Sequence, residues 1–333
     1  MARIVLGIAA SHTPLLALSA QHWEQRAAAD LANPQLNLSD GRRLTYDQLL
    51  AEVGPRHGSI VTPEVLQGKA ALCQAALDRL AAEFAAAQPD LAIIVGDDQR
   101  ELYTGANQPA LAVYHGEAIA MMDKLRKPDG PAWLQELGRG YLMDDSHVIP
   151  GAPGWGLDLI QGLLDADFDV AASDSVPDPH GAGFGHAFGF IVKRLFGGRQ
   201  VPVLPVLLNT YYPPNVPSAR RCVALGQAIR RVVEASPREA RVAVIGSGGL
   251  SHFVVDEALD RAVLDAIHRA DAEALGAIPR PALQSGSSEI LNWIVTAGAM
   301  LPTPVAWSDY QPLYRTPAGT GVGAGFVVWK DAH

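Results

Sequence analysis

Short apolar runs alternate with longer amphipathic stretches along most of the chain. Strand-like runs occupy residues 3–10, 91–95, 201–208 and 241–245. The clearest helical spacing lies at 62–87, where Thr62 suits an N-cap and Pro63 suits the first turn. Strand, helix and strand in succession favour parallel pairing. The pattern therefore predicts an α/β protein with a mostly parallel central sheet flanked by helices.

The same reading predicts the smaller elements. Further helices are expected at about 22–31, 46–53, 157–164, 185–196, 217–235, 256–275 and 285–300. Further strands are expected at 110–114 and 167–172, with edge strands at 305–307 and 325–329. Residues 105–154 are rich in Pro, Gly and Asp and allow only a sketch, while the turn-rich stretch 21–61 indicates an excursion over the sheet. No repeat or flexible linker divides the chain, so we expect one catalytic domain over 1–333.

Composition narrows the class of partner. A chain of 333 residues, 48% hydrophobic and 18% charged, can bury a large core. Its net charge of −9 argues against nucleic acid or an anionic membrane, and no apolar run approaches the length of a membrane span. Cys73 and Cys222 fall in helical apolar patterns and indicate buried thiols in a reducing compartment. With no signal-peptide pattern after Met1, we expect a cytoplasmic protein that binds small molecules.

Chemically capable side chains follow the ends of several predicted strands. In the stretch 241–261 the strand stops at Gly246-Ser247-Gly248-Gly249, and His252 and Glu257 follow. Similar strand ends, loops and helix starts carry further candidates, which are His12, His57, Gln99, His180, His186 and Glu289. Carboxyl ends of strands in an open parallel sheet border one crevice, so these groups could converge. Two imidazoles and a carboxylate suit a non-haem Fe(II) site, although each residue alone is more simply a cap or surface group.

Six motifs occur in an order that resembles a known family. They are GIAASHTP, the PRHG turn, GDDQ, GHAFGF, PVLLNTYYPPN and GSGGLSHFVVDEALDR. Together they resemble the LigB-type class III extradiol dioxygenases, nearest to the branch that contains 3-O-methylgallate and gallate dioxygenases. The resemblance implies that family's α/β fold and an Fe(II) enzyme that inserts O2 into a catechol-type ring and opens it.

The resemblance also implies the metal ligands. His12 matches the first metal histidine of the family, and His57, in the PRHG turn, matches the second. Glu257, five residues after His252, matches the metal carboxylate, and Glu289 is the weaker alternative. We therefore expect His12, His57 and Glu257 to bind Fe(II).

A further histidine beside the iron is expected to act as base and acid. His186 in GHAFGF is the first choice and His180 the second, while His252 would orient the ligand carboxylate or the substrate. Where many relatives end the second conserved strand in Asp-His, this chain has Asp98-Gln99. A glutamine amide can hydrogen-bond a phenol but cannot shuttle a proton. The loop 209–212, Asn-Thr-Tyr-Tyr, could shape the pocket.

Two other function classes stay open at this point. The same ligands could hold a redox-inert metal for hydrolysis, with His186 or His252 as base. Alternatively, the chain could be a non-catalytic superfamily relative, although a binding protein has no evident need for all of these histidines. The apolar strands near the C-terminal end also make a homodimer an expectation, unless they are covered internally.

Overall fold

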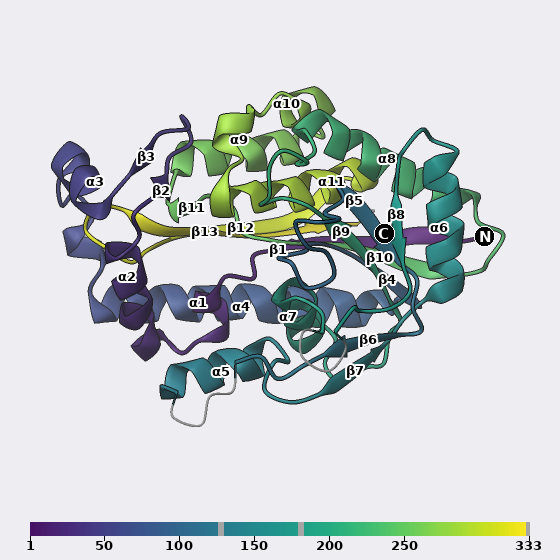
Figure 1. The fold of residues 1–333 in the computed structure, drawn as a ribbon, viewed down its shortest axis with the longest axis horizontal. Coiled ribbons are helices and arrows are strands. Elements are labelled where there is room, and N and C mark those ends of the chain that lie inside the picture. The colour runs from purple at the N-terminus through teal and green to yellow at the C-terminus, as the bar shows by residue number, and fades with distance from the viewer. Residues whose placement is uncertain (126–129, 179–182, 331–333) are drawn as a thin grey trace.

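The computed structural model describes residues 1–125, 130–178 and 183–330, and the statements below concern these residues. A nine-stranded mixed sheet crosses the middle of the molecule and helices cover both of its faces (Figure 1). Its strands, in spatial order, are β11 (His252–Val254), β13 (Thr320–Trp329), β1 (Arg3–Ala10), β10 (Arg241–Ser247), β4 (Leu91–Asp97), β9 (Val203–Leu208), β5 (Leu111–Tyr114) and β8 (Ala171–Ser173), with β12 (Val305–Tyr314) paired to β13.

Four adjacent parallel strands form the centre of the sheet. Strand β10 pairs in parallel with β1 and β4, and β9 pairs in parallel with β4. Because both faces of these strands are covered, their side chains are apolar in nearly continuous runs, and β4 is buried along its whole length. The predicted α/β fold with a mostly parallel sheet is confirmed. The carboxyl ends of β1, β10 and β4 meet at one edge, where the candidate site lies.

The helices form two layers, one below and one above the sheet as drawn in Figure 1. The lower layer consists of α1 (Pro14–Ala17), α4 (Pro63–Ala87), α5 (Ala132–Gly140) and α7 (His186–Leu195). The upper layer consists of α8 (Ala219–Ala235), α9 (Glu257–His268), α10 (Ala272–Gly276) and α11 (Ile290–Met300). Helix α6 (Pro153–Leu164) packs against α8 in the same core cluster and stands upright at the right-hand end of the sheet in Figure 1. Side chains alternate along each strand, so Ile94 and Ile245 pack on the lower layer while Ile93 and Val244 pack on the upper one.

The excursion lies beside the β12–β13 turn. It contains η1 (Ala20–His22), α2 (Trp23–Leu31), β2 (Leu36–Asn37), β3 (Arg43–Leu44), α3 (Tyr46–Val53) and η2 (Gly58–Ile60). Asp30 accepts two hydrogen bonds from Arg315, at 2.7 and 2.9 Å, and one from Thr320 at 2.8 Å. Both charged side chains are buried, so this bidentate pair fastens the excursion to the turn.

Several predicted boundaries were wrong. The expected helix 256–275 is two helices, because Ala270 adopts a left-handed backbone (φ 52°) between α9 and α10. The 3-10 turn η4 (Ser285–Glu289) precedes α11, and β8 begins after a turn at Asp167. Strand β13 is not an edge strand, because β1 and β11 pair with one side of it and β12 with the other.

The region that the sequence left as a sketch contains an antiparallel pair. It is formed by β6 (Ala118–Met121) and β7 (His147–Pro150), separate from the main sheet. The remaining short element is η3 (Arg280–Ala282). Within the described residues, no helix combines the length and the apolarity that crossing a membrane would require.

Candidate metal centre

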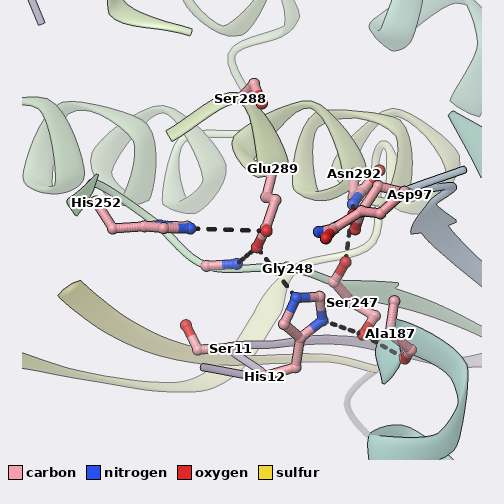
Figure 2. A network of polar contacts seen from close by, with 12 residues as sticks. Ser11, His12, Asp97, Ala187, Ser247, Gly248, His252, Ser288, Glu289 and Asn292 are labelled. Carbon is pink, nitrogen blue, oxygen red and sulfur yellow. Dashed lines mark hydrogen bonds and ion pairs between the residues drawn. The ribbon is translucent and has the colours of Figure 1, made fainter. Parts of the chain in front are cut away.

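Four polar side chains from distant parts of the chain meet at the carboxyl edge of the sheet (Figure 2). His12 follows β1, Ser247 ends β10, and Asp97 ends β4, while Glu289 comes from η4 on the upper layer. All four are buried. His12, Asp97 and Glu289 each offer one ligand atom. These three atoms lie within 4.8 Å of one another, close enough to bind a single metal ion.

The hydrogen bonds of His12 determine which ring nitrogen faces the cluster. Ser247 donates its one hydroxyl hydrogen to the Ala187 carbonyl at 2.7 Å, so it must accept from His12 Nδ1 at 2.9 Å. In the neutral ring the lone pair is therefore on Nε2. This atom lies 3.1 Å from Glu289 Oε2, but the approach lacks hydrogen-bond geometry, and the buried Nε2 has no hydrogen-bond partner among the described residues. An imidazole oriented in this way is ready to bind a metal.

Glu289 is surrounded by neutral donors and imidazoles. Tyr211 donates to Oε1 at 2.7 Å, and the Gly249 backbone N–H donates to Oε2 at 2.6 Å. Among the described residues, no Lys or Arg forms an ion pair with this carboxylate. Burial opposes its charge, but His12 and His252 outweigh burial and hold the pKa of Glu289 well below its usual range. The carboxylate thus keeps a negative charge that no Lys or Arg in the described part of the chain neutralises.

His252 approaches the same carboxylate from the other side. Its Nδ1 donates to the Leu250 carbonyl at 2.8 Å, which leaves Nε2 directed at Glu289 Oε1, 3.6 Å away. The 3-10 turn η4, which ends at Glu289, packs directly on the His252 ring. A Cβ added at Gly286 in this turn would lie 1.8 Å from His252 Cδ2. Two imidazole Nε2 atoms therefore converge on one buried carboxylate.

His186 and Asp97 complete the surroundings of His12. The His186 ring stands edge-on to the His12 ring, with centroids 4.6 Å apart. Its burial, together with the neighbouring His12, lowers the pKa of His186 to about 3, so the ring is neutral. Burial and the Glu289 charge raise the pKa of Asp97 to about 7, and Gln99 donates to Asp97 Oδ2 at 2.8 Å.

The other predicted ligands lie together in a second cluster, outside the group of His12, Asp97 and Glu289. The His57 ring stacks on Tyr314, with centroids 4.0 Å apart. The Tyr314 hydroxyl donates to Glu257 at 2.7 Å, and Arg261 forms an ion pair with the same carboxylate at 2.9 Å. The Glu257 side chain is 37% exposed, so its charge is already paired and solvated. His180 lies outside the described residues.

Sequence reasoning missed Asp97 and Ser247 as neighbours of the centre, named Tyr211 only as part of the loop 209–212 that could shape the pocket, and ranked Glu289 second. A signal for Glu289 was present: it begins the segment Glu-Ile-Leu-Asn-Trp-Ile-Val, which is apolar except for Glu289 and Asn292, and α11 is buried on every side. An acid at the start of such a helix has no solvent-facing side, and a fully buried acid needs partners. Ser247 and Tyr211 carry no comparable signal, because their roles depend on the tertiary fold.

Comparison with known proteins gives one family match over most of the chain. The profile described as the catalytic LigB subunit of aromatic ring-opening dioxygenase matches residues 54–323. A gallate dioxygenase of Pseudomonas putida is 42% identical over 100 residues, which are 29% of this chain and 27% of that protein.

Two further relatives are both 2,3-dihydroxyphenylpropionate/2,3-dihydroxicinnamic acid 1,2-dioxygenases. The protein of Paraburkholderia xenovorans is 42% identical over 96 residues, 29% of this chain and 28% of its own. The protein of Comamonas testosteroni is 29% identical over 185 residues, 54% of this chain and 49% of its own. The chain thus matches about a quarter to a half of the length of these curated relatives.

Proposed function

Because the chain belongs to the family of the catalytic LigB subunit of aromatic ring-opening dioxygenases, we propose that it uses Fe(II) and O2 to open a catechol-type ring. One observation carries the proposal: the Nε2 atoms of His12 and His252 converge on Glu289, a buried carboxylate without a fixed counter-charge among the described residues. Two histidines and a carboxylate are the set that binds Fe(II) in non-haem oxygenases.

His12 and Glu289 are the ligands that the geometry supports best. The buried, unpartnered Nε2 of His12 fits a metal, and the carboxylate beside it supplies the compensating charge. Burial lowers the pKa of His12, but the charge of Glu289 outweighs burial and raises it. A divalent cation can take the place of the proton that this histidine and carboxylate hold between them. Glu289 therefore takes the ligand role for which Glu257 was the first sequence candidate.

His57 is proposed as the second metal histidine on the resemblance alone. Its burial, aided by Arg56, lowers the pKa of its ring, so the imidazole is neutral as a ligand must be. His252 is the alternative for the second metal histidine, because its Nε2 faces Glu289 Oε1 at 3.6 Å. Metal content of His57→Ala and His252→Ala proteins separates these assignments.

The remaining histidines are proposed to move protons. When bound, ferrous iron would bring the ring diol and O2 into one coordination sphere. His186 is neutral and can therefore accept a phenolic proton, and we propose that the greater acidity of a metal-bound phenol offsets the low basicity that burial gives this ring. His252 takes the role if it is not a ligand. Gln99 is engaged with Asp97, so we propose that it fixes this carboxylate.

The proposed substrate is a small aromatic acid with adjacent hydroxyls, gallate-like or 3-O-methylgallate-like. The matched segments of the gallate and dihydroxyphenylpropionate dioxygenases support this class. A cytoplasmic location and a homodimer remain proposals that fractionation and light scattering would test.

The decisive experiment combines iron analysis with oxygen uptake. Protein prepared without air is loaded with Fe(II) and supplied with 3-O-methylgallate, gallate, protocatechuate or 2,3-dihydroxyphenylpropionate in an oxygen electrode. Stoichiometric iron with uptake on at least one ring is expected. Stable binding of a redox-inert metal without any uptake would overturn the proposal and favour the hydrolase alternative, while no metal binding would favour a non-catalytic relative.

A further inference from the structure

A further buried carboxylate, outside the candidate metal centre, lies behind the loop that precedes His252. Asp260 of α9 is 0% exposed. It accepts hydrogen bonds from the Ser251 backbone N–H, the Ser251 hydroxyl and the Tyr310 hydroxyl of β12, each at 2.7 Å. No Lys or Arg in the described parts of the chain forms an ion pair with it. A buried acid of this kind is costly unless donors surround it, so its place here calls for an explanation.

The three donors explain why this residue is a carboxylate. An ionised carboxylate only accepts, so all three hydrogens can point at it, whereas an amide would offer one oxygen and two competing hydrogens. Since the Ser251 hydroxyl donates to Asp260, its oxygen is free to accept from the Asp256 backbone N–H, at 2.8 Å. Asp260 thereby fixes both the main chain and the side chain of Ser251.

Strand β13 holds the same residue from another side. Gly323 N–H donates to the Ser251 carbonyl at 2.8 Å, and Leu250 N–H donates to the Gly323 carbonyl at 3.2 Å. A Cβ at Gly323 would lie 2.0 Å from Asp260 Oδ2, so the carboxylate packs directly on this strand. Ser251 is clamped between α9 and β13.

The clamped loop and His252, which follows it directly, both contact Glu289. Gly249 donates to Glu289 at 2.6 Å, and His252 faces it at 3.6 Å. The Leu250 carbonyl accepts from His252 Nδ1 and so selects the ring tautomer. A shift of Ser251 would move Leu250 on one side and His252 on the other.

We propose that Asp260 and Tyr310 are positioning residues that hold the Gly248–Ser251 loop, and through it set the tautomer and the place of the His252 ring at the metal centre. The catalytic consequence depends on the proposed dioxygenase function. The placement of the ring does not, and it can be measured in metal-free protein.

The test uses Asp260→Asn and Tyr310→Phe with imidazole-labelled protein. Nitrogen NMR of the metal-free parent should give a single His252 signal pattern, with one protonated Nδ1 resonance and one unprotonated Nε2 resonance, assigned with His252→Ala. In Asp260→Asn this signal should shift toward the other tautomer or broaden, with a smaller change in Tyr310→Phe. In the iron-loaded enzyme kcat should fall about tenfold to a hundredfold in Asp260→Asn, the range for outer-shell partners, with KM nearly unchanged.

Leu163→Ala is the control for a general loss of stability. Leu163 is fully buried in α6, which packs beside β5 at the other end of the sheet from β11 (Figure 1). Its replacement should lower the melting temperature and leave the His252 signal and kcat as in the parent. A parent-like His252 signal in Asp260→Asn, or the same signal change in Leu163→Ala, would overturn the inference. A parent without oxygen uptake would defeat the proposed function alone, since the NMR arm still decides the placement of His252.

Discussion

Two glutamates in this molecule each lie near a histidine, and their surroundings differ in every respect that matters for metal binding. Glu289 is buried beside His12, and its other direct partners are neutral donors and His252. Glu257 is 37% exposed, forms an ion pair with Arg261 and accepts from Tyr314, on which His57 stacks.

The two carboxylates differ in whether fixed charges and solvent already compensate their negative charge. Arg261 and water already satisfy Glu257, and burial of this carboxylate is too small to prevent the two side-chain donors from lowering its pKa. The negative charge of Glu289 is stabilised by His12 and His252, and a metal cation can replace the protons on these imidazoles. Burial without a fixed counter-charge therefore distinguishes the candidate ligand better than spacing from a histidine does.

The largest expected effect is the loss of metal in Glu289→Gln. Removing the proposed carboxylate ligand should weaken Fe(II) binding by more than about a hundredfold, above the range for outer-shell partners. Glu257→Gln is the matched control and should bind Fe(II) like the parent. Calorimetric titration without air measures both, and the reverse ranking would restore Glu257 as the ligand.

The next comparison sets His12→Ala against His57→Ala. Loss of His12 should abolish stoichiometric iron, because no other described imidazole replaces its Nε2 beside Glu289 Oε2. His57→Ala should weaken binding at least about tenfold if the resemblance assigns its role correctly. Metal analysis after gel filtration measures retention, and parent-like affinity in His57→Ala would transfer the position to His252.

A smaller effect is expected from Ser247→Ala. The change removes the acceptor that orients His12 Nδ1 and leaves the Ala187 carbonyl without its side-chain donor. Fe(II) affinity should fall about tenfold to a hundredfold, and the free energy of unfolding should drop by about 1–3 kcal/mol. Titration and urea unfolding measure the two effects, and unchanged affinity would mean that Ser247 does not orient the ring. Ser236→Ala, a buried serine at the end of α8, is the control.

The smallest effect should come from Tyr314→Phe. This variant keeps the ring that stacks on His57 and loses only the hydrogen bond to the partly exposed Glu257. Stability should fall by about 0.5–1.5 kcal/mol, with Fe(II) affinity unchanged. Thermal unfolding and titration measure both, and a large loss of iron would show that the second cluster takes part in binding.

Much of the architecture could be predicted from apolar periodicity, because the central strands are covered on both faces and read as continuous runs. Their order could not be predicted: β13 joins the sheet beside β1 through pairing of residues more than 300 positions apart. Among the site residues, His12 follows its strand closely and its proximity to the edge was predictable. The choice between Glu257 and Glu289 depends on which side chain the fold covers, and its one signal in the sequence is the apolar segment that Glu289 begins.

The position of β1 has a consequence for how the protein is made. This strand leaves the ribosome long before its two neighbours, β10 and β13, which contain residues 241–247 and 320–329. Until they emerge, β1 has two open edges and the chain remains exposed to mispairing. Glu289 also follows β10 in the chain, so the His12–Glu289 pair of the candidate metal centre cannot form until most of the sheet has been made.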